Sequence, residues 1–175
     1  VDDDGNELPA GTVGNLAFKR PDPVMMLEYW RAPEATAKKF AGDWMITGDL
    51  ARADEEGFYW FHGRADDVIT SSGYRIGPTE IEDAIIRHPA VSMAAAIGVP
   101  HPERTEIIRA YVSLLPGHTP SDTLAEEIRQ SVRDRLAKHE YPREIRFVDA
   151  FPMTTTGKIL RRELRDQARL EQKAQ

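Results

Sequence analysis

The segment ADDVITSSGYRIGP, residues 65–78, marks the point where the character of the sequence changes. Two short apolar runs, Val68-Ile69 and Tyr74-Arg75-Ile76, flank Ser71-Ser72-Gly73, and this pattern predicts a β-hairpin. Pro78 fits the first turn of a helix, because the N–H group that proline lacks would have no partner there. We therefore expect a domain to begin here, after a linker at Arg64-Ala65-Asp66-Asp67.

Downstream of the hairpin, helical and strand patterns alternate. The helix from Pro78 is expected to reach about His88, and a longer helix is expected from Ser121 to about Lys138. The other expected elements are strands at 91–99, 107–115 and 145–149 and a polar helix at about 159–170. The order βαββαβα predicts an α+β domain with a three-stranded sheet and two covering helices.

Residues 1–65 have a different, β-rich pattern. Strands are expected at 13–20, 44–52 and 58–62, with a short helix at 32–40. An acidic turn, Asp54-Glu55-Glu56-Gly57, joins the second and third strands. Because the sequence opens with Val1 and a turn-like segment, we interpret it as a piece of a longer protein.

The composition argues against several classes of function. A net charge of −6 argues against a nucleic-acid partner, and no apolar run is long enough to cross a bilayer. The lack of cysteine excludes a disulfide framework and a thiolate metal site, and it suits a reducing compartment. The five histidines have no metal-ligand spacing, so no protein-bound metal is expected.

Four motifs follow one another along the chain: T-G-D at 47–49, G-R-x-D-D at 63–67, S-G-Y-R-I-G-P at 72–78 and P-x-x-x-x-G-K at 152–158. The last is similar to a nucleotide phosphate loop but has Pro152 and Ile159 where that loop needs a glycine and a hydroxyl. Together with HPAV, KHEYPREI and TGKILR, these motifs closely resemble the carboxyl-terminal region of AMP-forming acyl-CoA synthetases of the adenylate-forming superfamily, most of all the medium-chain branch. The resemblance covers nearly the whole chain.

The resemblance implies a domain organisation. Residues 1–65 would be the distal β-rich end of a large domain, and residues 66–175 a small mobile domain that turns about a hinge at Asp66. The phosphate loop and the acyl pocket of the family lie upstream, in a missing amino-terminal domain of the same polypeptide.

The resemblance also implies nucleotide-binding residues. Asp49 would accept hydrogen bonds from the ribose hydroxyls of ATP or AMP, Arg64 would contact ribose and α-phosphate, and Lys158 would be the catalytic cation for acyl-adenylate formation. Without the resemblance, Asp49 would be interpreted as a turn residue, Arg64 as a partner of Asp66 or Asp67, and Lys158 as a surface charge.

A second group of residues is implied to bind CoA. Gly73 would leave room for the pantetheine arm, although it is also expected to supply a positive φ in a tight hairpin. Arg133 would bind a phosphate, although it is also suited to pair with Glu126 or Glu127. Arg75 would face the substrate or the adenylate. The full CoA set is Ser72, Gly73, Tyr74, Arg104, Arg133, Tyr141, Pro142 and Arg143.

The expected function is activation of a short- to medium-chain carboxylic acid with ATP to acyl-AMP, followed by transfer to CoA. Mg²⁺ would be held mainly by the nucleotide. The location implied is the cytoplasm, or the mitochondrial matrix in a eukaryote. Two alternatives stay open: an adenylation domain that loads a carrier protein, and a non-catalytic module that binds CoA or a nucleotide.

Overall fold

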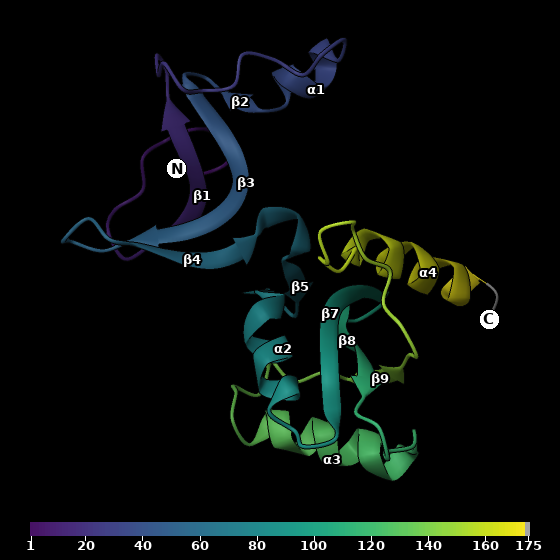
Figure 1. The fold of residues 1–175 in the computed structure, drawn as a ribbon. Helices are drawn as coiled ribbons and strands as arrows, with labels where there is room; N and C mark the ends of the chain where they lie inside the picture. The colour runs from purple at the N-terminus through teal and green to yellow at the C-terminus, as the bar shows by residue number, and fades with distance from the viewer. Residues whose placement is uncertain (174–175) are drawn as a thin grey trace. The chain divides into compact units, whose positions relative to one another are not determined.

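The computed structural model describes residues 1–173 and divides the chain into two compact units, Val1–Asp66 and Asp67–Gln175. Each unit is built around its own β-sheet (Figure 1). Helices and strands occur in both units, which confirms the α+β class. Within residues 1–173, no helix has the length and apolar character required to span a bilayer.

The sheet of the first unit is organised around one long strand. This strand, β3 (Trp44–Ala53), pairs antiparallel with β1 (Val13–Lys19), β2 (Phe40–Ala41) and β4 (Tyr59–Arg64). The helix expected at 32–40 is limited to α1 (Pro33–Ala37), because the chain turns at Lys38 to form β2. Among the described apolar side chains of this unit, Leu50 and Ala51 alone are buried.

The second unit contains a mixed five-stranded sheet. The strands run in the order β6 (Tyr74–Ile76), β5 (Ile69–Ser71), β8 (Thr105–Leu114) and β7 (Val91–His101), and β9 (Glu144–Phe147) pairs parallel with β8. A 3-10 turn, η1 (Ala65–Asp67), precedes β5. The helices are α2 (Pro78–Ile86), α3 (Asp122–Arg133) and α4 (Arg161–Lys173).

The predicted hairpin belongs to the same sheet as the three predicted strands. Ser71 of β5 pairs with Thr105 of β8, and the Glu106 carboxylate accepts a hydrogen bond from the Thr70 N–H at 2.8 Å. Gly98 of β7 makes this possible, because a Cβ at that position would collide with the Glu106 side chain. These bonds join segments that are more than 30 residues apart, so local patterns do not reveal them.

The long helix is shorter than predicted. It begins as expected at the Ser121 N-cap, whose Oγ accepts from the Leu124 N–H at 3.1 Å. It ends at Arg133 instead of about Lys138. The Arg135 N–H donates to the Val132 carbonyl, three residues back instead of four, and the Ala137 N–H donates forward to the Glu140 carboxylate.

The core of the second unit lies on both faces of the sheet. On one face, α2 and α3 pack against residues that include Ala94 and Ala96 of β7. On the other face, Leu164 and Ala168 of α4 pack against Ala95, Ile97 and Val99 of the same strand, together with Tyr111 and Phe151. Successive residues of β7 therefore point to opposite faces of the sheet. The helix α4, which the sequence predicts to be polar, covers the second face with one apolar stripe.

Candidate functional site

The β5–β6 hairpin turns through two residues with left-handed backbone. Ser72 has φ +51° and Gly73 has φ +84°, the geometry of a type I′ turn. Arg104 holds the turn, since its carbonyl accepts from the Ser72 N–H at 2.9 Å and its Nη1 donates to the Ser72 Oγ at 3.1 Å. A Cβ added at Gly73 would have nothing within 4 Å, so the fold requires the backbone conformation of glycine here and leaves the space beyond it open.

A cavity of about 200 Å³ opens beside this hairpin. It is lined by side chains from the hairpin, from the start of β8 and from the segment before β9, that is, Ser71, Ser72, Tyr74, Arg104, Ile108, Lys138, His139, Tyr141 and Arg143. The Tyr74 and His139 rings stack with their centroids 4.0 Å apart. The cavity thus combines cationic side chains with aromatic faces.

Five of the residues implied to bind CoA line this cavity: Ser72, Tyr74, Arg104, Tyr141 and Arg143. Lys138 and His139 also line it, and the sequence reasoning missed both, although they lie within the motif KHEYPREI that carried the family resemblance. The signal that could have found them was the alternation of basic and aromatic side chains in that motif.

Three other residues of the predicted CoA set lie differently. The Arg133 guanidinium lies over the Tyr141 ring at 5.6 Å, whereas Glu126, its suggested alternative partner, pairs with Arg129. Pro142 is fully buried, so its ring packs inside the unit instead of lining the cavity. Gly73 forms the tip of the hairpin.

Arg143 is fixed by its backbone. Its N–H donates to the Ile108 carbonyl at 2.8 Å, and its carbonyl accepts from Arg129 Nη1 at 3.2 Å. Its guanidinium lies 4.7 Å from the centroid of the Tyr141 ring. Arg75, which is implied to face the adenylate, lies on β6 opposite Thr70 with an exposed side chain.

Lys158 extends from a tightly closed loop. The Thr154 N–H donates to the Lys158 carbonyl at 2.8 Å, and the Lys158 N–H donates to the Thr154 Oγ1 at 3.0 Å. Gly157 permits the turn with φ +79°, and a β-bridge between Met153 and Ile159 closes the loop. The backbone is therefore held while the Lys158 side chain is exposed to solvent.

The remaining predicted nucleotide residues lie in the first unit. Asp49 and Arg64 are register partners on β3 and β4, and Arg64 Nη1 donates to Asp49 Oδ1 at 3.1 Å. Arg64 Nε donates to Asp66 Oδ1, also at 3.1 Å. Burial lowers the pKa of the Arg64 guanidinium, but the hydrogen bonds and charges of Asp66 and Asp49 outweigh that effect, so its pKa is raised. Arg64 is thus a permanent cation aligned by two carboxylates.

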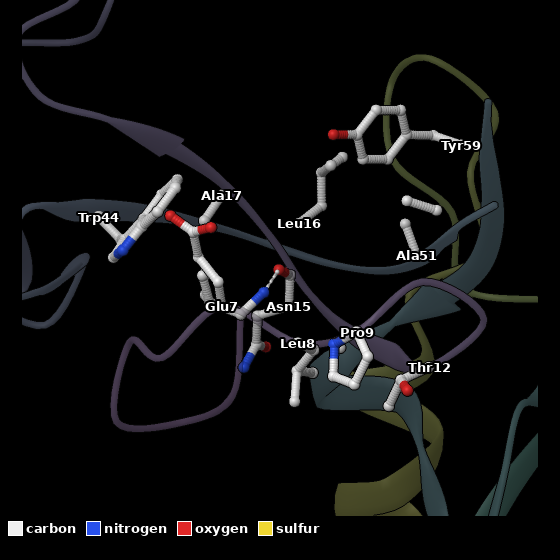
Figure 2. Close-up of a pocket in the computed structure, with 13 residues that line it drawn as sticks. Glu7, Leu8, Pro9, Thr12, Asn15, Leu16, Ala17, Trp44, Ala51 and Tyr59 are labelled. Carbon is white, nitrogen blue, oxygen red and sulfur yellow. Dashed lines mark hydrogen bonds between the residues drawn. The ribbon is translucent and has the colours of Figure 1, made fainter. Parts of the chain in front are cut away.

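A second cavity, of about 240 Å³, lies in the first unit between the residue 1–12 segment and the sheet (Figure 2). Glu7, Leu8, Trp44 and Tyr59 are among its lining residues, and none of the predicted site residues lines it. Its lining offers no cluster of charged groups. Among residues 1–173, no group of three or more His, Asp or Glu side chains is arranged to hold a metal ion.

Comparison with known proteins gives close relatives. Residues 80–158 match the AMP-binding enzyme C-terminal domain. The chain is 51% identical over 166 residues to the acetyl-coenzyme A synthetase of Bacillus subtilis (strain 168), covering 94% of this chain and 29% of that protein. It is 45% identical over 172 residues to the mitochondrial acyl-coenzyme A synthetase ACSM5 of Homo sapiens, covering 95% and 30%.

Among solved structures, ATP-bound MatB from Rhodopseudomonas palustris matches with a TM-score of 0.83 at 35% identity, covering 95% of this chain and 32% of that chain. The chain spans about 30% of the length of the curated relatives it matches.

Proposed function

The chain belongs to the AMP-forming acyl-CoA synthetases, whose AMP-binding C-terminal domain it contains, and from this we propose the reaction of the protein of which it is part. A carboxylate oxygen of the substrate attacks the α-phosphorus of ATP, and pyrophosphate leaves. The CoA sulfur then attacks the carbonyl carbon of the acyl-adenylate, and AMP leaves. We propose a short- to medium-chain acid as substrate.

The observation that carries this proposal is the cavity beside the hairpin. Arg104, Lys138 and Arg143 line it, and guanidinium and ammonium groups suit the phosphates of CoA. Tyr74, His139 and Tyr141 add aromatic side chains to the lining, and an adenine ring can extend the stack that Tyr74 and His139 form with each other. The open space beyond Gly73 suits a narrow chain such as pantetheine.

The proposed chemistry assigns the first step to Lys158. Its exposed ammonium stabilises the charge that develops on the carboxylate and the α-phosphate during adenylate formation, which is electrostatic catalysis by a positioned cation. Asp49 accepts hydrogen bonds from the ribose hydroxyls, because a carboxylate has several acceptor sites. The Arg64 guanidinium orients this carboxylate, with Nη1 donating to Oδ1 at 3.1 Å. Arg75 contacts the adenylate.

We assign the alternation between the two steps to a rotation at Asp66. This residue lies at the boundary between the two compact units, where few residues need to change φ and ψ for a hinge motion. Mg²⁺ would arrive with the ATP phosphates instead of being held by this chain. The human relative is named as mitochondrial, and we propose the mitochondrial matrix for a eukaryotic source and the cytoplasm for a bacterial one.

The first unit is proposed to be the distal end of the large domain. Phe58, Tyr59, Trp60 and Phe61 are consecutive and all exposed, with Phe61 at 65%. Because successive strand residues face opposite sides of a sheet, both faces of this strand carry aromatic side chains. Such a strand is suited to burial on both faces by further polypeptide.

The test is turnover by the complete protein with ATP, Mg²⁺, free CoA and a series of acids from acetate to octanoate. We expect pyrophosphate release and acyl-CoA formation, whereas residues 1–175 alone should form neither product, because the upstream phosphate loop is missing. Adenylation without transfer to free CoA would favour a carrier-loading enzyme. Binding without pyrophosphate release would favour a non-catalytic module, and turnover by residues 1–175 alone would contradict the proposed division of the site.

A further inference from the structure

A buried charge network lies at the start of α4, directly after the Lys158 loop. Arg161 makes a bidentate pair with Glu82 of α2, with Nε to Oε1 at 3.0 Å and Nη2 to Oε2 at 2.6 Å. Asp67 accepts from Arg161 Nη1 at 3.4 Å and from Arg165 Nη1 at 2.8 Å. Glu82 Oε1 also accepts the Ala96 N–H at 2.8 Å.

This network is desolvated at its acidic side. Glu82 is 8% exposed, and the Asp67 side chain is 11% exposed. Bidentate arginine–carboxylate pairs in such surroundings fix geometry as well as charge. The network therefore ties the first turn of α4 to α2, to β7 and to the first residue of the second unit.

The first residues of α4 depart from the usual charge preference of a helix N-terminus, and the network explains this departure. Arg161 and Arg162 are the first two residues of the helix, where the helix dipole favours anions and disfavours cations. Lys158 adds a further positive charge three residues earlier. Glu163 supplies one carboxylate within the first turn, and Glu82 and Asp67 offset the arginine charge from elsewhere in the unit.

Arg161 is also close to Lys158 along the backbone. The Leu160 N–H donates to the Pro152 carbonyl at 2.8 Å and completes the closure of the loop. The loop then enters α4 at the next residue, Arg161. The contacts of the Arg161 side chain with Glu82 and Asp67 therefore fix the position of the backbone at the end of the Lys158 loop.

We propose that Arg161 is the positioning residue for Lys158, with Glu82 and Asp67 as the carboxylates that hold it. This rests on the proposed function insofar as Lys158 acts in acyl-adenylate formation. A cation must be placed within fractions of an ångström to stabilise a transition state, and a displacement of about 1 Å costs on the order of 100-fold in rate. Because Asp67 follows the proposed hinge residue, the network also makes the loop move with the unit as one body.

The first test uses the chain itself and does not depend on activity. In Arg161→Lys the charge stays but the bidentate geometry is lost, so hydrogen exchange at the Lys158 and Leu160 amides should accelerate by about tenfold or more. Arg162→Lys is the matched control, because the side chain of Arg162 is 88% exposed, and it should leave both amides unchanged. Unchanged exchange in Arg161→Lys would overturn the proposal.

A second control separates positioning from general destabilisation. Arg109 is a buried arginine that holds the other end of α4, with Nη1 donating to Glu171 at 2.9 Å and Nε to Glu144 at 2.7 Å. Arg109→Lys should accelerate exchange in β8 and β9 without a selective effect on the Lys158 loop. An equal acceleration of the loop in Arg109→Lys and Arg161→Lys would mean that Arg161 only stabilises the unit.

The second test measures the two half-reactions in the complete enzyme. Arg161→Lys should slow acyl-adenylate formation by about 10- to 100-fold and leave CoA transfer from synthetic adenylate within about twofold. Equal losses in both steps would overturn the positioning role. If the wild-type enzyme makes no adenylate, the proposed function fails while the exchange test still decides the role of Arg161. If Arg161→Lys does not fold, Glu82→Gln replaces it, since the amide oxygen can still accept from the Ala96 N–H. Glu82→Gln must then show the same selective acceleration of exchange at the Lys158 loop and the same selective loss of adenylate formation.

Discussion

The two units of this chain have comparable β-sheets but very different interiors. In the first unit, Leu50 and Ala51 are the buried apolar side chains, and every other buried apolar side chain of residues 1–173 belongs to the second unit. Trp30 is 80% exposed, in contrast to Ile97 of the second unit at 1%. Both units thus have a hydrogen-bonded sheet, whereas nearly all of the apolar burial lies in the second.

This difference shows that strand pairing alone does not give a unit a large apolar core. A hydrogen bond in a sheet largely replaces one to water, so its net contribution is only about 1 kcal/mol, whereas burial of apolar surface is the main driving force of folding. The second unit has helices on both faces of its sheet. The proposed role of the first unit, as the distal end of a larger domain, would complete its core with further polypeptide.

The largest expected effect is on hydrogen exchange of the isolated chain. Amides of β8, such as Ala110, should be protected by the full stability of the second unit, about 5 kcal/mol or a factor of several thousand. Amides of the first unit, such as Ile46, which donates to the Lys39 carbonyl at 2.7 Å, should exchange far faster. Equal protection of the two sheets in the isolated chain would break the comparison.

The second effect is on catalysis and leaves the second unit folded. In the complete protein, Lys158→Ala should slow acyl-adenylate formation by about 10²–10³, or roughly 3–4 kcal/mol, because a positioned charge is lost from the transition state. CoA transfer from synthetic adenylate should be spared. Since the side chain is exposed, the free energy of unfolding should change by less than about 0.5 kcal/mol.

The measurements for Lys158→Ala are pyrophosphate release from acid and ATP and acyl-CoA formation from synthetic adenylate. Equal loss of both rates in a folded protein would contradict the assignment of Lys158 to one step.

A smaller effect is expected from Gly73→Leu. At φ +84°, a branched side chain costs about 1–2 kcal/mol in backbone strain, so stability falls as well as thioester formation. Gly117→Leu is the matched control, because Gly117 has φ +92° and equally open surroundings, and it lies in a turn away from the cavity. Denaturant unfolding should show equal destabilisation of the two variants. Rates of the two half-reactions should show that CoA transfer is impaired in Gly73→Leu alone. Impairment of CoA transfer in both variants would mean that the hairpin has a structural role and does not contact CoA.

The smallest effect concerns the β3–β4 turn of the first unit. The Trp60 indole donates to the Asp54 carboxylate at 3.1 Å, and this bond, with the Phe58 and Glu56 N–H groups, lowers the pKa of Asp54 from its usual 3.8. A lowered pKa means that the carboxylate stabilises the turn above about pH 4 and that this stabilisation is lost as pH falls through the lowered value.

The fluorescence of the tryptophans in the isolated chain is the readout for this turn. It should change on acidification in the wild type, and Asp54→Asn should lack the component that comes from Trp60. An identical acid response of the two proteins would exclude Asp54 as its source.

Much of the fold follows from local features of the sequence. The pattern around Ser71-Ser72-Gly73 predicts the hairpin, Pro78 the start of α2 and Ser121 the start of α3, because turn and helix-start preferences act over a few residues. The motifs also identified the family, since they combine residue types at defined spacings.

Only the tertiary structure decided how these pieces meet. Glu106 links the hairpin to the larger sheet, His139 stacks on Tyr74, and Arg161 pairs with Glu82 across 79 residues of sequence. Pro142, which the family resemblance placed among the CoA residues, is buried. A side chain that packs on a neighbour is chosen by the shape and charge of that neighbour, which a local pattern does not contain. Propensity and capping therefore determined the elements, and burial and pairing between distant segments determined the cavity and the support of the Lys158 loop.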